Sequence, residues 1–399
     1  MPKATKALNI AELRKLARRR LPRGIFDCID RGAEDETGLA GLRQVFDAIS
    51  FNPKVLADVS ARSLETMLLG HRQPMPLAIA PTAAAGLVSP EGEVALARAA
   101  AAAGIPFCIA TGSITAMERI VAESTGPLWF QLYMWRDKAL SYALIDRAAR
   151  AGIGTLVLTV DTVAPPNREY NARNGFEIPI RASLRGGLDM VLHPRWVWRV
   201  LLRAMLREGI PTYRHYPDGF RARITRKATW EQVRLNDAIT WQDLDELRRR
   251  WSGKLILKGV LRTDDALRAA QARVDAIVVS SHGARNLDAA VAPAEALPAI
   301  AEALAGRIEI IADSGIRRGS DILKLLALGA DAVLIGRAAL YGTAAGGEAG
   351  ASHALDLLRR EMDATLAFLG CQHLSELDRG FVNLPLWHPP APHSDRQHP

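Results

Sequence analysis

Short apolar runs alternate with longer amphipathic stretches along most of this chain. From Pro76 onward, eight mainly apolar runs of four to six residues follow one another, at 77–80, 105–110, 128–132, 155–160, 255–258, 276–280, 308–312 and 332–335. Runs of this kind are typical of strands that are buried on both faces, as in parallel sheets. The stretches between the runs have the apolar spacing of helices, for example at 91–103, 138–151, 241–251 and 321–328.

Eight strand-then-helix units predict an α/β fold whose strands close into a (β/α)8 TIM barrel. A doubly wound open sheet is the alternative, but the even repetition of eight units favours closure. We expect residues 1–75 to form a helical extension packed on one end of the barrel. The barrel would span 76–384, with an insertion at 162–239 after the fourth strand and a Pro- and His-rich, disordered tail at 385–399.

Composition and charge exclude several classes of protein. The chain is 49% hydrophobic and 24% charged, which is ordinary for a globular protein, and it has neither a long apolar span nor an apolar secretory signal. We therefore expect a cytoplasmic location. The net charge of +8 fits an anionic substrate or membrane surface better than nucleic acid, because no nucleic-acid-binding motif accompanies it. Cys28, Cys108 and Cys371 match neither a disulfide framework nor a metal site.

The ends of the predicted strands carry polar residues or glycine. This placement is informative because catalytic groups in a TIM barrel come from the C-terminal ends of the strands. In chain order, the ends carry Pro81, Thr82 and Ala83, then Thr111, Gln131, Tyr133, Thr159, Asp161, Lys258, Ser280, Ser281 and His282, and finally Asp313, Ser314, Gly315, Gly336 and Arg337.

The last two strand ends have the features of a phosphate site. Gly315 and Gly336 allow backbone N–H groups to approach an anion closely, and Arg317 and Arg337 add positive charge. Loops after the seventh and eighth strands are where this fold usually binds phosphate. Two tight turns without a ligand are the alternative.

The segment SSHGARNLD (280–288) carries the most distinctive candidate chemistry. His282 follows a strand directly and is suited to accept a proton near neutral pH, while Arg285 can bind a carboxylate through two hydrogen bonds. Asp161 ends the fourth strand and is suited to orient His282 and to stabilise its imidazolium form, although a turn or helix-capping role explains it equally well.

Three further side chains each allow two interpretations. Lys258 ends an apolar strand, so its ammonium needs either an anionic ligand or an acidic residue as a partner. Arg168, in the polar start of the insertion, is either a second carboxylate ligand or a surface residue. Tyr133 offers a phenol at the mouth of the barrel, although a tyrosine at such a position often serves packing alone.

Taken together, these residues resemble the FMN-dependent 2-hydroxy-acid oxidising family, which includes glycolate oxidase, L-lactate dehydrogenase and mandelate dehydrogenase. The resemblance covers about residues 10–380, and its last segment is most like the mandelate and lactate dehydrogenases. The matching segments are GAEDE (32–36), APTA (80–83), PLWFQLY (127–133), LTVD (158–161), LKG (257–259), SHGARNLD (281–288) and DSGIRRGSDILKLLALGADAVLIGRAALYG (313–342). The resemblance implies FMN as the cofactor and oxidation of an L-2-hydroxy acid, lactate-like or mandelate-like, to the 2-oxo acid.

The resemblance also implies roles at the matching positions. His282 would accept the substrate's proton with Asp161 behind it, Arg168 and Arg285 would bind the carboxylate, and Tyr133 would bond the hydroxyl or the developing oxo group. Lys258 would lie at the N1/O2 edge of the flavin, and the last two strand ends would hold the phosphate. The full set of expected FMN contacts is Pro81, Thr82, Ala83, Gln131, Thr159, Lys258, Asp313, Ser314, Gly315, Arg317, Gly336 and Arg337.

Several positions depart from the family pattern. Cys28 stands where the family usually has a tyrosine that helps to hold the substrate carboxylate, and Ala110 stands where serine is common. The usual NHGGRQLD is changed at Ser281, Ala284 and Asn286. If nothing replaces the hydrogen bond from that tyrosine to the substrate carboxylate, the free energy of substrate binding would weaken by about 1.5–3 kcal/mol. We therefore expect Cys28 to alter the choice of substrate, by making room for an acid bulkier than lactate, rather than the chemistry.

The insertion carries a candidate membrane-binding segment. Residues 181–207 combine six arginines with Trp196, Trp198 and several leucines, which is typical of a basic amphipathic helix in a membrane interface. The alternative is a helix packed on the barrel with a solvated arginine face. Because membrane-bound members of the resembled family use this insertion, we expect peripheral association with the inner face of the cell membrane. We also expect a quinone or similar electron acceptor, and a homo-oligomer.

Other functions are alternatives to this interpretation. A soluble oxidase that uses O2 would share the site but not the membrane surface. Another phosphate-binding barrel enzyme, such as an isomerase, would explain the phosphate loops but not the joint presence of Asp161, Arg168, His282 and Arg285. A barrel that has lost turnover, through changes such as Cys28, is the third alternative.

Overall fold

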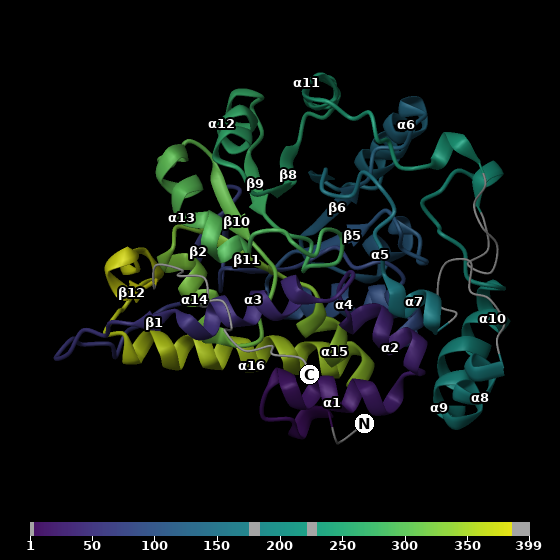
Figure 1. Ribbon diagram of the computed structural model, residues 1–399, viewed down its shortest axis with the longest axis horizontal. Coiled ribbons are helices and arrows are strands. Elements are labelled where there is room, and N and C mark those ends of the chain that lie inside the picture. Colours follow the sequence, from purple (N-terminus) through teal and green to yellow (C-terminus); the bar gives the residue numbers. More distant parts are fainter. Residues whose placement is uncertain (1–3, 175–183, 222–229, 385–399) are drawn as a thin grey trace, which may run out of the picture.

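The predicted closed barrel is confirmed by the computed structural model, which describes residues 4–174, 184–221 and 230–384 (Figure 1). Eight parallel strands close in the order β10-β11-β4-β5-β6-β7-β8-β9. Every predicted strand is present, with bounds that differ by at most two residues. The strands are β4 (Leu77–Ile79), β5 (Phe107–Ala110), β6 (Leu128–Leu132), β7 (Thr155–Thr159), β8 (Lys254–Val260), β9 (Ala276–Val279), β10 (Glu309–Ala312) and β11 (Ala332–Ile335).

Helices surround the barrel because each has one apolar face to bury. Capping fixes where several of them begin: Thr240 and Asp243 form a capping box at the start of α11, and Asp137 accepts a hydrogen bond from the Ala139 N–H at the start of α6. The surrounding helices are α4 (Gly92–Ala102), α5 (Met117–Glu123), α6 (Lys138–Arg150), α11 (Trp241–Arg250), α12 (Thr263–Gln271), α13 (Pro293–Leu304), α14 (Gly319–Ala327) and α15 (Arg337–Gly346). A long helix, α16 (Glu348–Phe368), packs against α4, α14 and α15.

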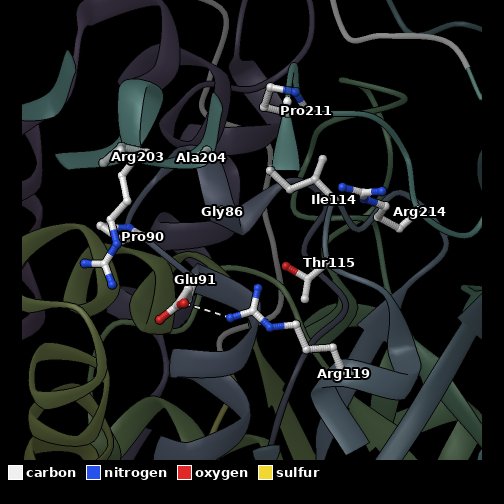
Figure 2. Close-up of a pocket in the computed structure, with 12 residues that line it drawn as sticks. Gly86, Pro90, Glu91, Ile114, Thr115, Arg119, Arg203, Ala204, Pro211 and Arg214 are labelled. Carbon is white, nitrogen blue, oxygen red and sulfur yellow. Dashed lines mark hydrogen bonds and ion pairs between the residues drawn. The ribbon is translucent and has the colours of Figure 1, made fainter. Parts of the chain in front are cut away.

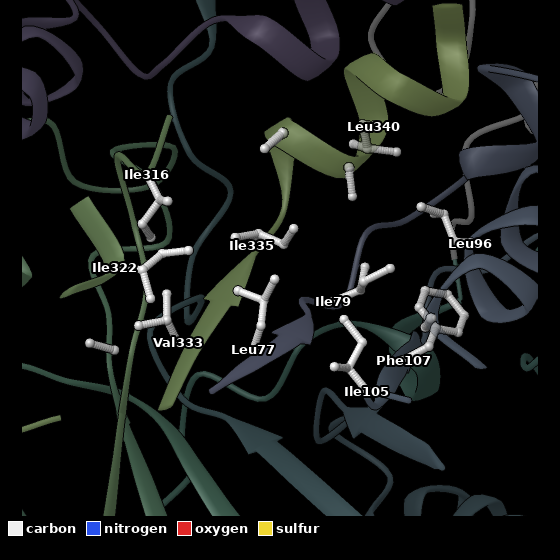
Figure 3. Packing of buried hydrophobic residues seen from close by; sticks show 14 of the residues in the cluster. Leu77, Ile79, Leu96, Ile105, Phe107, Ile316, Ile322, Val333, Ile335 and Leu340 are labelled. Atoms are coloured by element: carbon white, nitrogen blue, oxygen red, sulfur yellow. The ribbon is translucent and has the colours of Figure 1, made fainter. Parts of the chain in front are cut away.

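Alternate residues of each strand face two separate apolar cores. In β4, Leu77 and Ile79 belong to the core between strands and helices, while Ala78 belongs to the core inside the barrel. Figure 3 shows these outward side chains beside Val333 and Ile335 of β11. This alternation follows from the two-residue period of a strand and explains why the strands are apolar throughout.

The N-terminal extension reaches both ends of the barrel and is not purely helical. It contains α1 (Ile10–Arg20), α2 (Arg23–Asp30), α3 (Thr37–Ala48) and the hairpin of β2 (Thr66–Leu68) and β3 (His71–Gln73), and β1 (Ser50–Phe51) pairs with β12 (Val382–Asn383). Leu68 and Leu69 join the core inside the barrel, and the Leu69 N–H donates to the Glu309 carboxylate where β10 begins. At the opposite end, the Ala33 N–H donates to the Ala284 carbonyl beyond β9.

The insertion does not form the single amphipathic helix expected over 181–207. Residues 181–183 lie outside the described residues, and α8 (Leu184–Leu192) is followed by a new start at α9 (Pro194–Trp196). Proline disfavours helical backbone in the preceding residue but is well suited to the first turn of a new helix. A π-helical turn η3 (Val197–Leu202) and α10 (Arg203–Glu208) complete this unit, which lies at the right edge of Figure 1.

The rest of the insertion is short helical turns and loop. It begins with α7 (Glu169–Arg173) and includes the turns η4 (Asp218–Phe220) and η5 (Glu231–Val233). Among the described residues, no helix combines the length and the apolar character needed to cross a bilayer. The tail at 385–399, which we expected to be disordered, lies outside the described residues.

Candidate active site

His282 lies directly beyond β9 in a backbone conformation that few residues adopt. Its φ angle is 55°, in the left-handed region that costs free energy for a residue with a side chain. Two hydrogen bonds hold this turn: the His282 N–H donates to Ser280 Oγ (3.0 Å), and the Gly283 N–H donates to Ser314 Oγ (2.9 Å). The loop is therefore fixed by its neighbours in the orientation that places the imidazole over the barrel mouth.

The imidazole of His282 has one nitrogen bonded to an acid and the other facing a phenol. Nδ1 donates to Asp161 Oδ1 at 2.8 Å, and Nε2 lies 3.4 Å from the Tyr133 hydroxyl. Burial lowers the pKa of His282 and the Asp161 charge raises it, with a net lowering. Burial raises the pKa of Asp161, but the charges of His282 and Lys258 outweigh it and lower this pKa to about 2. The pair is therefore a neutral base backed by a carboxylate.

Lys258 is buried and paired with acids of the chain itself. Its Nζ lies 3.1 Å from Asp313 Oδ2 and 3.9 Å from Asp161 Oδ2, and it donates to Ser280 Oγ at 2.6 Å. Burial lowers the pKa of Lys258, but the two carboxylates raise it further, so the ammonium keeps its proton. Gly259 makes room for this cluster, because a Cβ there would lie 2.6 Å from the Asp161 Cβ.

Two guanidinium groups lie beside His282 without a carboxylate partner. Arg168 donates through Nε to the Arg285 carbonyl (3.0 Å) and through Nη2 to Asn286 Oδ1 (3.2 Å), while Arg285 donates to the Arg31 carbonyl (3.0 Å). In the part of the chain that the structure describes, neither forms an ion pair. Burial and the charge of Arg285 lower the pKa of Arg168 to about 10. Two neighbouring cations of this kind are suited to bind an anion such as a carboxylate.

Among the described residues, buried polar atoms without hydrogen-bond partners lie at or just beyond the ends of β4, β6 and β7. Thr82 Oγ1, Gln131 Nε2 and Thr159 Oγ1 are buried and make no hydrogen bond, although the Thr111 N–H holds the Gln131 amide through Oε1 (3.2 Å). A buried polar group without a partner costs about 1–3 kcal/mol. These atoms therefore indicate that a ligand with polar edges lies on this side of the rim.

Positive charge also collects where β10 and β11 end. Arg337 is buried and donates to the carbonyls of Ile29 and Arg31, and its pKa is lowered to about 9 by burial and by the charges of Arg285 and Arg317. It is the first residue of α15, whose N-terminus adds the positive end of a helix dipole. Arg337 forms no ion pair among the described residues, and such an arginine at a helix N-terminus favours a phosphate.

A sequence model described as FMN-dependent dehydrogenase matches residues 17–384. The chain belongs to this family. Members of this family carry FMN, so the cofactor is FMN and the protein is an oxidoreductase.

Characterised relatives span nearly the whole chain. The (S)-mandelate dehydrogenase of Pseudomonas putida is 41% identical over 374 residues, which cover 94% of this chain and 93% of the relative. An L-lactate dehydrogenase of Xanthomonas campestris pv. campestris is 42% identical over 371 residues, 92% of this chain and 94% of the relative. A crystal structure of the monotopic membrane protein (S)-mandelate dehydrogenase matches with a TM-score of 0.89 and 40% identity, covering 95% of this chain and 99% of that one.

The geometry fits FMN, and the expected contact of the cofactor with Asp313 stays a prediction. The orphaned atoms of Thr82, Gln131 and Thr159 suit the polar edges of a flavin, and the arginines near α15 suit its phosphate. Asp313, expected beside the phosphate, gives its carboxylate to Lys258 and to the Ser314 hydroxyl (2.7 Å). A carboxylate would repel a phosphate, so the Asp313 side chain belongs to the Lys258 cluster.

A recess open to solvent lies under the insertion (Figure 2). It has about 540 Å³ of empty volume, open to solvent, between α10 and the loops that follow β4 and β5, and the Glu91–Arg119 ion pair (2.7 Å) lies on its wall. A smaller hollow of about 210 Å³ is lined by Tyr133, Thr159 and Thr162 at the rim itself. The smaller hollow, and not the larger recess, adjoins the predicted catalytic groups.

Asn286 connects the groups of the site in a way that sequence reasoning missed. Its amide donates to the Asp161 carbonyl (2.9 Å) and to Thr162 Oγ1 (2.7 Å), and its oxygen accepts from Arg168. We had noted Asn286 only as a departure from the family pattern. Its position four residues after His282 was the available signal, since that spacing keeps it in the same loop.

Proposed function

We propose that the protein oxidises an L-2-hydroxy acid of the lactate or mandelate class to the 2-oxo acid. The observation that carries the proposal is the imidazole of His282, whose Nδ1 bonds Asp161 and whose Nε2 lies 3.4 Å from the Tyr133 hydroxyl. Beside it lie two guanidinium groups that form no ion pair among the described residues. This set can hold a carboxylate and remove a proton from the neighbouring hydroxylated carbon. The relatives named for L-lactate and (S)-mandelate support the same class of substrate.

Each residue has a defined task in this reaction. Arg168 and Arg285 bind the substrate carboxylate, and Tyr133 bonds the 2-hydroxyl. His282 accepts one proton at Nε2, and Asp161 stabilises the imidazolium that results. FMN, when bound, would supply the redox chemistry by accepting the two electrons and the second proton that the substrate loses.

We propose that the cofactor lies on the rim residues already described. Pro81, Thr82, Ala83, Gln131 and Thr159 would hold the ring system, with Lys258 near its N1/O2 edge. The ammonium keeps its proton in this cluster, so it remains a hydrogen-bond donor for a polar edge placed nearby. The phosphate would bind at Gly315, Arg317, Gly336 and Arg337, with Ser314 holding the loop beneath it.

We also propose that α8–α10 places the enzyme on the inner face of the cell membrane. Leu192, Trp198 and Leu206 are 69%, 70% and 86% exposed, and Arg195 and Arg199 are exposed among them. Exposed apolar side chains mixed with arginines suit an anionic membrane interface. The monotopic description of the similar crystal structure supports this assignment, and a membrane quinone would then be the natural electron acceptor. We further propose a homo-oligomer, as expected from the sequence.

Anaerobic mixing of the purified protein with L-lactate or (S)-mandelate tests the proposed reaction. We expect the flavin absorbance to bleach and one 2-oxo acid to form for each FMN reduced. A flavin that none of a panel of aliphatic and aromatic 2-hydroxy acids bleaches would contradict the proposal and favour the barrel without turnover. Rapid reoxidation by air, rather than by a quinone, would favour the O2-using alternative.

A further inference from the structure

Four residues of the insertion, Tyr213–Tyr216, are hydrogen-bonded to the catalytic rim. The Arg214 N–H donates to the Ser113 carbonyl (3.0 Å), and His215 Nδ1 bonds the Ala110 carbonyl at the end of β5 (2.9 Å). His215 is buried and lies edge-on to Phe130 of β6, with ring centroids 5.3 Å apart. Burial lowers the pKa of His215 to about 4, so the anchor is uncharged. Figure 2 shows Arg214 of this segment, and Pro211 shortly before it, near Ile114 of the same rim.

This attachment holds two tyrosine rings in a fixed wall. Tyr213 and Tyr216 stack with centroids 5.3 Å apart and an interplanar angle of 27°, and Tyr216 packs on Trp135 at 5.0 Å. Trp135 follows the proposed catalytic Tyr133 by two residues. The wall therefore runs alongside the strand end that carries Tyr133.

The Tyr213 ring occupies space beside the proposed flavin bed. Its Cε1 lies 3.7 Å from the position a Cβ would take on Gly112, and that position is 3.0 Å from the Cβ of Ala83. A Cβ at 112 would thus make an ordinary contact with the ring and a tight one with Ala83. The Tyr213 ring therefore lies near the loop that carries Ala83.

Tyr213 is also within electrostatic range of Cys28, which stands where the family usually has a tyrosine. Burial, the Tyr216 phenol and the Cys28 thiol all raise the pKa of Tyr213, and Cys28 also acts on the proposed carboxylate ligand Arg168. Cys28 is small and partly exposed. Tyr213 is therefore near Ala83, a proposed flavin contact, and within range of Cys28, which also acts on Arg168.

We propose that Tyr213 determines specificity, its ring forming with Tyr216 the wall that holds an aromatic side chain of the 2-hydroxy acid. This inference rests on the proposed function and narrows its substrate class to aryl acids. An aryl group gains contact area and favourable ring geometry against such a wall, whereas the methyl group of lactate reaches little of it.

Three variants test the wall: Tyr213→Ala, Tyr213→Phe and, as a matched control remote from the site, Tyr142→Ala. The readout is the efficiency of anaerobic flavin reduction by (S)-mandelate divided by that for L-lactate. We expect Tyr213→Ala to lower this ratio by about tenfold or more, as loss of apolar contact does in hydrophobic pockets. Tyr213→Phe should keep the ratio within about twofold because it keeps the ring. FMN content checks that each variant is folded.

A second readout does not depend on turnover. Phenylacetate has the aryl group and carboxylate but no hydroxyl to oxidise, so calorimetry can measure its binding to each holoprotein. Tyr213→Ala should weaken phenylacetate binding by a factor similar to the change in the ratio, and acetate binding should stay constant. Unchanged phenylacetate binding in Tyr213→Ala, or an equal loss in Tyr213→Phe, would overturn the wall. If neither acid bleaches the wild-type flavin, the proposed function is contradicted. The role of Tyr213 in binding an aryl group is then tested by phenylacetate binding alone.

Discussion

The catalytic rim and the helices α8–α10 of the insertion differ in how their side chains are satisfied: the rim residues bond one another, whereas apolar side chains of α8–α10 are exposed. At the rim, His282, Asp161 and Lys258 hold one another through short contacts, and a strained backbone angle at His282 is fixed by two hydrogen bonds. On α8–α10, Trp198 and Leu206 are left exposed. A preorganised site needs its groups fixed before the substrate arrives, whereas a surface that meets a membrane finds its partners only there. Chemistry and location are therefore assigned to separate parts of one chain.

The separation is incomplete, because the insertion also supplies groups to the rim. Arg168 stands near its start and bonds the His282 loop, and His215 ties a later segment to the end of β5. Among the described residues, none of the proposed catalytic groups lies on α8–α10. Variants in each region therefore test whether catalysis and membrane binding are separable.

Replacing His282 with alanine should have the largest effect. Removal of a general base lowers the rate by about 10²–10⁴-fold, and FMN binding should survive because the flavin contacts lie on other strand ends. Anaerobic stopped-flow spectroscopy measures flavin reduction, and the visible spectrum reports FMN content. Reduction at the wild-type rate in His282→Ala would remove this residue from the role of base.

Replacing Arg168 with methionine should weaken substrate binding more than chemistry. A hydrogen bond to a charged group contributes about 1.5–3 kcal/mol, so KM should rise by about 10–150-fold. Steady-state kinetics with an artificial acceptor measures this rise. Arg173→Met, in the same helix–loop region but paired with Glu169, provides the control. Equal KM values in both variants would argue against Arg168 as a carboxylate ligand.

The double variant Trp198→Glu and Leu206→Glu should release the protein from membranes. Each change removes an exposed apolar side chain and adds negative charge, so partitioning onto anionic lipid vesicles should fall by about tenfold or more. Flavin reduction should stay at the wild-type rate. Retained vesicle binding in this variant would contradict the assignment of α8–α10 to the membrane.

The smallest effect concerns pH. The pKa of His282 is lowered from its ordinary 6.5, and the base works only when neutral, so flavin reduction should fall as pH falls through that lowered pKa. The acid limb of the rate profile should therefore lie below pH 6.5. Because Asp161 raises this pKa, Asp161→Asn should move the limb to still lower pH. An acid limb centred well above 6.5 would contradict a neutral resting imidazole.

The sequence was most informative where burial dictates a simple pattern. Strands such as β7 are covered on both faces, so their sequences are unbroken apolar runs. Because the C-terminal ends of parallel strands meet at one rim of the barrel, Asp161 and His282 could be placed together there. The hairpin of β2 and β3 was missed because its strands are short and β3 is mostly polar (HRQ).

Contacts between distant segments left no such pattern. The acid that pairs with Lys258 was unknown until the fold brought Asp313 within 3.1 Å, and no periodicity links Tyr213 or His215 to the end of β5. Pro194 is the sequence signal that divides the arginine-rich segment into two helices. The prediction of a single helix over 181–207 did not take it into account.

One side-by-side measurement tests most directly whether the rim alone performs the chemistry. Anaerobic flavin reduction by (S)-mandelate is followed in the wild type, in His282→Ala and in the Trp198→Glu, Leu206→Glu double variant, all loaded with FMN. We predict fast bleaching in the wild type and the double variant, and almost none in His282→Ala. Fast bleaching in His282→Ala, or its loss in the double variant, would contradict the account.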